Sequence, residues 1–293
     1  MSRPRVIRLL VLSCVAAAAT AALACDRREA GRPADSAIDT AQPVHVAKRP
    51  PTDWATELGQ LLLVPSDSDN AAVVLYPDEP TSQLIGSAPT TLISVSGETT
   101  QVRLVPSDSQ QCGDAPMVRL SGAAPAGWSI GLLGRSGALL PMDSIEALPS
   151  ADSARMAADL ARLASGLSTH RDSRFSGLPF AVLTAHRFSR DSRQFLVGHL
   201  ARRLNQEAAP LEERTLIIAE RSAAGAPYSV TYSQRSEGSE DAAEHFEALA
   251  AVRGRRSTLL LIARDQISQT NYEVLERVPN GTWRSRWSRK LAC

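Results

Sequence analysis

The tetrapeptide Pro279-Asn280-Gly281-Thr282 constrains the fold of this chain more than any other stretch. Asn-Gly is the pair favoured in a two-residue β-hairpin turn, because both central residues take positive φ. On either side, in Tyr272–Val278 and Thr282–Ser288, apolar and aromatic residues are interspersed with polar ones, as in half-buried strands. The end of the chain is therefore expected to contain an antiparallel sheet.

Pairing outward from this turn predicts a register and two faces. It places Val278 opposite Trp283, Glu276 opposite Ser285, and Val274 opposite Trp287. The apolar face would then hold Tyr272, Val274, Val278, Trp283 and Trp287, and we interpret both tryptophans as core residues. The opposite face would gather Arg277, Arg284 and Arg286, a candidate interaction surface for an anionic envelope component or an acidic partner.

Residues 151–293 as a whole are predicted to be α+β, an antiparallel sheet carrying one or two packed helices. One helix would begin with Ser150 as N-cap and end at Gly166, and a second would run from about Ser239 to Arg253, with Gly254 after it. The other expected strands are Ala181–Phe188, Phe195–Leu204, Arg214–Arg221, Tyr228–Gln234 and Thr258–Ala263.

Residues 53–150 are predicted to be rich in β-structure. Short apolar or alternating runs are separated there by clusters of Pro, Gly, Ser, Asp and Asn, a pattern typical of a small sandwich or barrel. The runs are Gln60–Val64, Ala71–Tyr76, Thr91–Val95, Gln101–Val105, Met117–Leu120 and Trp128–Leu133.

The balance of acidic and basic residues also changes at the boundary between residues 53–150 and 151–293. Residues 53–150 carry 3 basic and 11 acidic side chains, whereas residues 151–293 carry 21 basic and 16 acidic ones. This step indicates two segments of different character, an acidic one and a basic one. Two interpretations stay open: the segments pack on each other, or a basic face meets an anionic lipid or an acidic partner.

The N-terminus has the layout of a secretory signal peptide. Arg3, Arg5 and Arg8 precede an uncharged apolar run, Leu9–Ala24, which ends directly before Cys25. A cysteine after a small residue makes this segment resemble the lipobox of bacterial lipoproteins, although Ala22 stands where that family favours leucine. The resemblance implies that residues 1–25 form a lipoprotein signal peptide. Cys25 would become the first mature residue and carry acyl chains such as palmitate.

This resemblance implies an extracytoplasmic protein of the cell envelope, anchored in the inner or the outer membrane through its N-terminal lipid. Two or more acyl chains give stable anchoring. Ordinary cleavage before Cys25 would instead release a soluble protein. An uncleaved anchor is disfavoured, because the apolar run is shorter than the roughly 20 residues that span a bilayer as a helix. Residues 26–52, rich in Ala, Pro, Arg and Asp, would form a flexible tether.

Apart from the acylated Cys25, the mature chain would contain two cysteines, Cys112 and Cys293. An even pair in an oxidising compartment predicts a disulfide. It would join the acidic segment to the end of the basic one.

No coherent catalytic or cofactor motif is present in the sequence. Ser136 lies in Gly134–Gly137, which resembles the nucleophile segment of trypsin-like proteases, and His186 follows a stretch similar to that of their general base. However, the order along the chain is reversed and no matching aspartate lies between them. The sequence also lacks metal-ligand spacings, phosphate-binding glycine motifs and evidence for nucleic-acid binding, so no metal, cofactor, nucleotide or nucleic acid is expected.

The leading hypothesis is a non-catalytic envelope protein that binds another protein or an envelope component. A small-ligand carrier, with an apolar cavity against the C-terminal sheet, is one alternative. An unrecognised hydrolase that uses Ser136 and His186 is the other.

Overall fold

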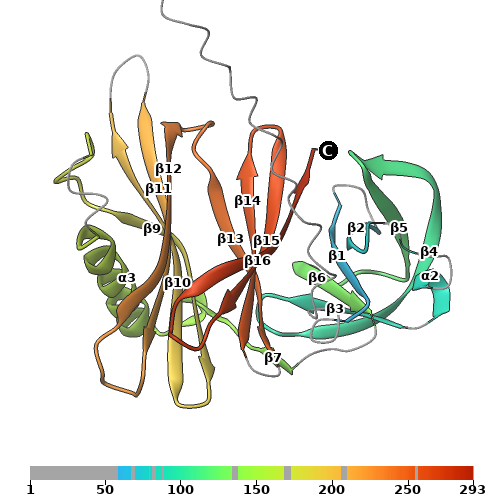
Figure 1. Ribbon diagram of the computed structural model, residues 1–293, viewed down its shortest axis with the longest axis horizontal. Helices are drawn as coiled ribbons and strands as arrows, with labels where there is room; N and C mark the ends of the chain where they lie inside the picture. Colours follow the sequence, from blue (N-terminus) through green and yellow to red (C-terminus); the bar gives the residue numbers. More distant parts are fainter. Residues whose placement is uncertain are drawn as a thin grey trace, which may run out of the picture. The chain divides into compact units, whose positions relative to one another are not determined.

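Antiparallel strands make up most of the computed structural model (Figure 1). The structure describes residues 59–66, 70–78, 80, 84–87, 89–133, 138–167, 173–205, 210–254 and 257–292. Its strands form a closed barrel of six and two sheets of five strands each. Within these residues the only helix longer than a single turn is α3, Ser150–Ser165.

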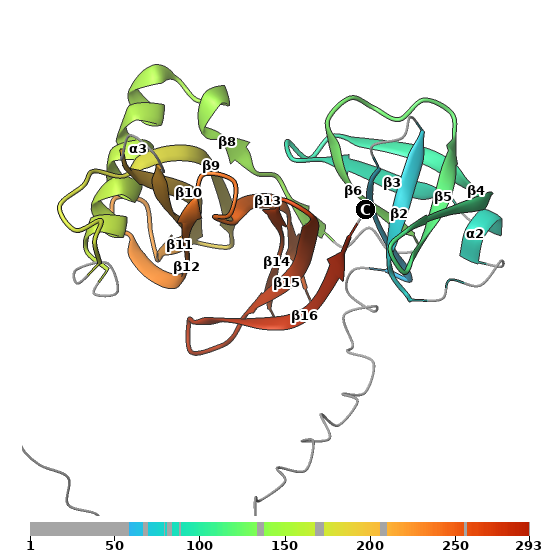
Figure 2. The ribbon, with the colours of Figure 1, turned by 90° about the horizontal axis from the view of Figure 1, so that it is seen from above.

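The barrel has the strand order β1-β2-β5-β4-β3-β6 (Figure 2). Its strands are β1 (Leu61–Pro65), β2 (Ala71–Tyr76), β3 (Thr90–Ser94), β4 (Thr99–Cys112), β5 (Ala115–Ser121) and β6 (Trp128–Leu133), and the short turn α2 (Leu84–Ser87) lies between β2 and β3. The six strands predicted from the sequence are present, and of the two architectures expected for this segment the barrel is the one formed.

Side chains that alternate along the barrel strands belong to two different apolar clusters. Leu61 and Leu63 of β1 belong to the cluster that contains Val74, Leu92 and other barrel residues. Leu62 and Val64 belong to another cluster, which includes residues of β13 to β16. Because successive side chains of a strand point to opposite faces, one short apolar strand serves both clusters.

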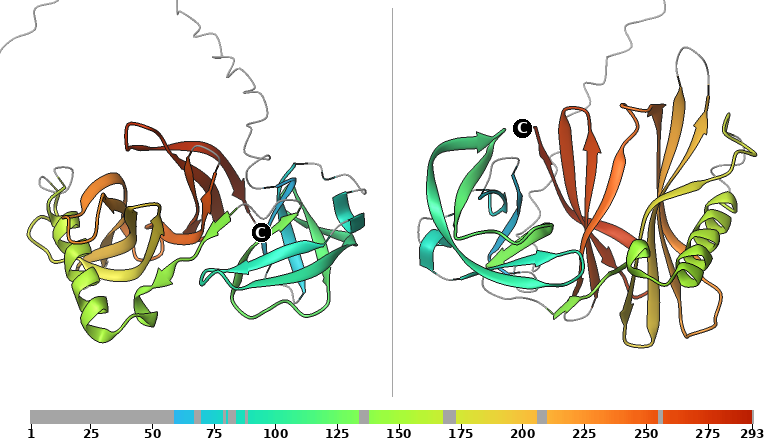
Figure 3. Two further views of the ribbon diagram at one scale, coloured as in Figure 1. Left: turned by 90° about the horizontal axis from the view of Figure 1, so that it is seen from below. Right: turned by 180° about the vertical axis from the view of Figure 1, so that it is seen from behind.

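The two five-stranded sheets face each other across a shared core (Figure 3). One sheet has the order β12-β11-β10-β9-β8 and the other β16-β15-β14-β13-β7. The strands are β7 (Ala138–Leu140), β8 (Asp143–Ser144), β9 (Ala181–Arg190), β10 (Arg193–Leu204), β11 (Leu211–Arg221), β12 (Ser229–Ser239), β13 (His245–Arg253), β14 (Thr258–Gln266), β15 (Gln269–Arg277) and β16 (Trp283–Leu291).

The sheet of β13 to β16 is covered on both faces. In β14, Leu259 and Leu261 pack in the cluster shared with the barrel, whereas Leu260 and Ile262 pack between the two sheets. A strand buried on both faces needs a continuous apolar run, which explains the sequence of Thr258–Ala263.

Helix α3 covers the outer face of the β9–β12 sheet through Met156, Leu160 and Ala164. The predicted helix is therefore present and ends at Gly166 as expected. Its N-cap is Pro149, without a side-chain cap, so the prediction of Ser150 as N-cap was wrong.

The predicted α+β class is wrong, because the fold is mostly β and the second expected helix does not form. Residues 239–253 instead contain a turn and strand β13. A bulge between Ala248 and Ala250 places Leu249 and Ala250 on the barrel side, while Ala248 and Ala251 face the other sheet. Burial between two layers has overridden the helical propensity of this alanine-rich segment.

The C-terminal hairpin forms, but its register near the turn differs from the prediction. Trp283 pairs with Arg277, and a bulge between Val274 and Leu275 restores the predicted pairing of Val274 with Trp287. The loop contains a longer turn, in which Gly281 has φ 91° and the Asn280 side chain accepts hydrogen bonds from Thr282. Trp283 consequently packs between the sheets and Trp287 against the barrel cluster, so they do not share a face.

Candidate binding site

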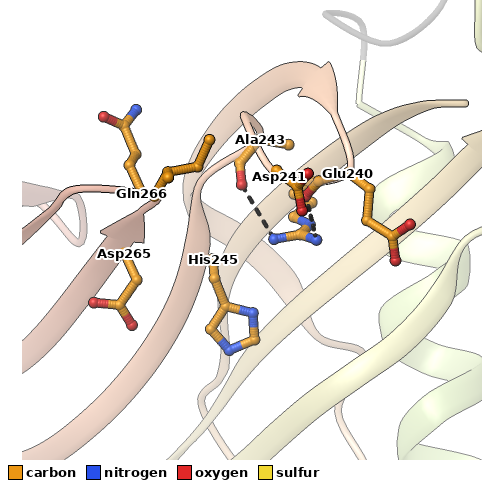
Figure 4. Close-up of a pocket in the computed structure, with 8 residues that line it drawn as sticks. Glu240, Asp241, Ala243, His245, Asp265 and Gln266 are labelled. Carbon is orange, nitrogen blue, oxygen red and sulfur yellow. Dashed lines mark hydrogen bonds between the residues drawn. The ribbon is translucent and has the colours of Figure 1, made fainter. Parts of the chain in front are cut away.

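A hollow of about 500 Å³ lies where the turn before β13 meets the turn after β14 (Figure 4). The turn before β13 contributes Glu240, Asp241 and Ala243 to its lining. His245 begins β13, and Asp265, Gln266 and Ile267 come from the end of β14 and the turn after it. Arg214 of β11 completes the lining.

Arg214 fixes the turn that forms one wall of the hollow. Its Nε donates to a Glu212 carboxylate oxygen at 2.8 Å. Its Nη1 donates to the carbonyl of Ala243 at 3.1 Å and its Nη2 to that of Glu240 at 3.0 Å. Glu212 is 1% exposed, so the positive charge of Arg214 is balanced inside the protein.

The lining therefore has an excess of negative charge. Glu240 is exposed and pairs with Arg203 at 3.0 Å, and Asp265 accepts a hydrogen bond from the Thr270 hydroxyl at 2.6 Å. Asp241 is also exposed. At the rim, Ile267 is an apolar side chain that is 77% exposed. Carboxylates beside an exposed apolar group are complementary to a ligand that carries both a positive charge and an apolar part.

Two histidines lie in contact next to the hollow. The rings of His199 and His245 are 4.5 Å apart between centroids and nearly perpendicular. Burial, with the positive charges of His245 and Arg214, lowers the pKa of His199 to about 3. Burial and then Arg214 also lower the pKa of His245, against the opposing effect of Asp265. Both rings are thus neutral at pH 7.

His199 should make the stability of the fold depend on pH. It is 2% exposed, and neither ring nitrogen has a hydrogen-bond partner in the described part of the chain. Because its folded pKa lies below the ordinary value of 6.5, its contribution is complete above pH 6.5 and is lost as the pH falls toward 3. The free energy of unfolding should drop by roughly 2–3 kcal/mol over the first two pH units below 6.5.

Urea titrations of the wild type and His199→Phe across this pH range test the expectation. The variant should have the shallower pH dependence. The control is His186→Phe, which removes a half-buried histidine whose pKa is also lowered and should change the slope less. An unchanged slope in His199→Phe would contradict the assignment.

Of the two residues suggested for a hydrolase, Ser136 lies outside the described residues, so only His186 is described. His186 lies on β9 and pairs with Ser144 of β8 in the sheet. Burial lowers its pKa, against the attraction of Glu146, and its Nδ1 has no hydrogen-bond partner in the part of the chain the structure describes.

The arginines of the predicted interaction face lie in different surroundings. Arg277 makes a two-point ion pair with Glu220, at 2.6 and 2.8 Å. Arg284 and Arg286 both pair with Glu276, at 2.9 and 3.5 Å, and Arg284 is the one that is largely exposed. Much of their charge is therefore compensated within the protein, and their role in binding remains a prediction.

Of the cysteines, Cys112 ends β4 and is buried in the cluster shared by the barrel and β13 to β16. Cys25 and Cys293 lie outside the described residues, as do the predicted signal peptide, 1–25, and tether, 26–52.

No protein-family model, curated protein or solved structure matches this chain. Over the described ranges, no three His, Cys, Asp or Glu side chains are grouped so that they could hold a metal ion. None of the helices in those ranges is both long enough and apolar enough to span a bilayer.

Proposed function

We propose that this chain is a lipid-anchored, extracytoplasmic protein of the bacterial cell envelope whose folded part binds a ligand or partner without catalysing a reaction. The observation that carries the binding role is the acidic hollow beside His245. Its volume, about 500 Å³, falls in the range of roughly 300–1,000 Å³ found for small-molecule sites. The anchor rests on the lipobox-like segment that ends at Cys25.

The lining of the hollow favours a charged group over a purely apolar one. A carrier of apolar ligands needs a cavity lined mainly by apolar side chains. Here Glu240, Asp241 and Asp265 line the hollow together with a neutral histidine, and the exposed Ile267 adds an apolar side chain at its rim. We infer that the ligand presents an amine or a basic side chain, whether on a partner protein or on an envelope component.

The anchor is tested by Cys25→Ser. Cells that produce the wild type should yield a membrane-bound protein whose N-terminal peptide carries acyl mass on Cys25. The variant should lack that mass. If the wild-type peptide carries no acyl group, the lipoprotein proposal fails, whatever the folded part binds.

Binding at the hollow is tested by crosslinking in cells, followed by purification of the acylated protein and mass spectrometry. Asp241→Asn with Asp265→Asn should lose a partner that the wild type captures at near-stoichiometric yield. The matched control is Asp152→Asn with Asp159→Asn, which removes two carboxylates from α3 instead. A partner that both pairs of substitutions retain would contradict a role for the hollow.

A further inference from the structure

A second, smaller hollow of about 190 Å³ lies at the other end of β13. Its lining includes Arg190, Arg193, Ser257, Thr258 and Arg277, from three loops and the strand ends beside them. His245, the first residue of β13, lines the acidic hollow. Arg253, the last residue of β13, lies next to the smaller hollow, with its Nη1 3.3 Å from the carboxylate of Asp191, which lines that hollow. Eight steps of about 3.3 Å put the two ends of the strand roughly 26 Å apart, so the two hollows are separate.

Two arginines at this hollow share one carboxylate. The Arg277 guanidinium donates to both oxygens of Glu220, from Nε at 2.6 Å and from Nη2 at 2.8 Å. Nη1 of Arg193 lies 3.4 Å from the same Glu220. Glu220 is 8% exposed and so is held between the two cations.

A second pair of arginines shares Asp191. Arg190 Nε lies 3.6 Å from this carboxylate and Arg253 Nη1 lies 3.3 Å from it. Arg190 is held in place further by Thr258, whose hydroxyl accepts from its Nη1 at 3.1 Å, and by the carbonyl of Gly254. Three of the four guanidinium groups, those of Arg190, Arg193 and Arg277, line the hollow, and Arg253 lies beside it, paired with Asp191. The four share two carboxylates, which leaves an excess of two positive charges around the hollow.

Donors remain for a ligand. Each guanidinium has five N–H groups, and Glu220 takes two from Arg277 and one from Arg193. The side chains of Arg193 and Arg253 are 46% and 45% exposed and reachable from solvent. The hollow has room for roughly six water volumes of about 30 Å³ each, enough for one tetrahedral oxyanion.

We propose that this arginine-lined hollow binds a phosphate group in its doubly charged form. A phosphate monoester carries nearly two negative charges at pH 7 and several strong acceptor oxygens, which match the excess charge and the free donors. Arginine is the side chain suited to such recognition, because its planar fork donates two parallel hydrogen bonds. The phosphate comes either free or on a lipid headgroup, and the proposal does not depend on the ligand of the acidic hollow.

The test uses the full-length protein in a non-ionic detergent and follows its thermal unfolding. The probes are inorganic phosphate, dihexanoyl phosphatidic acid and, as a neutral comparison, dihexanoyl phosphatidylcholine. A ligand that binds only the folded state raises the unfolding temperature in proportion to its concentration over Kd. Stabilisation by inorganic phosphate identifies a site for free phosphate, and stabilisation by the acidic lipid alone identifies a headgroup site. Either result supports the proposal.

The decisive variant is Arg193→Gln with Arg253→Gln, which removes the excess charge and spares the buried Arg277–Glu220 pair. We expect Kd for the active probe to rise about tenfold or more. The matched control is Arg155→Gln with Arg162→Gln, which removes two exposed positive charges from α3 and should bind as the wild type does. The proposal is overturned if neither phosphate probe stabilises the wild type, or if both double variants lose binding equally.

Discussion

Glu213→Gln is expected to lower the free energy of unfolding by roughly 3–5 kcal/mol, the largest effect of any single side chain considered. Glu213 is fully buried, and Arg202, 4% exposed, donates to both of its carboxylate oxygens at 2.8 and 3.0 Å. Arg202 also donates to the Ser173 hydroxyl at 2.8 Å and stacks near the rings of Phe175 and Phe180. Neutralising Glu213 removes the buried carboxylate with which both Arg202 and Arg235 pair.

Urea denaturation of the wild type and of three variants measures this effect. Replacing both partners, as Arg202→Met with Glu213→Leu, should recover most of the loss, because neither charge is then buried alone. Asp159→Asn breaks an exposed pair with Arg162 on α3 and should cost less than about 1 kcal/mol. If Glu213→Gln lowers the free energy of unfolding no more than Asp159→Asn does, the buried Arg202–Glu213 pair does not stabilise the fold as expected.

The sequence predicted well those elements whose patterns are local. Turn residues between short apolar runs indicated every barrel strand, and the spacing of Met156 and Leu160 indicated the face of α3. The segment 239–253 failed because its alanines and charges favour a helix locally. Its burial as β13 between two layers depends on residues far away in the chain, such as Leu62 and Leu260.

The hairpin register and the two hollows could not be predicted either, because they too depend on features that local sequence patterns do not show. A single bulge at Val274 moved Trp283 to the other face, and bulges have no reliable signature in one sequence. Nothing in the sequence around His199 or His245 indicates that their rings meet. Their contact, and the meeting of Arg214 with the turn at Glu240, join positions 26 to 46 residues apart. The only hint was the density of acidic residues from Glu237 to Glu247.

Loss of the predicted Cys112–Cys293 disulfide should cost about 2–5 kcal/mol of stability, the second large effect. The bond itself stays a prediction, because Cys293 lies outside the described residues, but the neighbours of the two cysteines lie close together. A Cβ added at Gly113 would lie 3.0 Å from the carbonyl of Ala292, so the residue after Cys112 touches the residue before Cys293. Disulfides join residues whose Cα atoms are roughly 4.4–6.8 Å apart, a distance that such neighbours can meet.

Cys293→Ser is the cleaner variant, because Cys112 is buried and its replacement would also disturb the core. The bond would close a loop of about 180 residues, for which restriction of the unfolded chain contributes roughly 5 kcal/mol in the entropic model. Dithiothreitol should therefore lower the urea midpoint of the wild type to that of Cys293→Ser and leave the variant unchanged. Two thiols that react in the unfolded, unreduced mature protein would rule the bond out. With the bond present, the end of β16 is fastened to the end of β4, so the last strand of the C-terminal sheet cannot separate from the barrel without reduction.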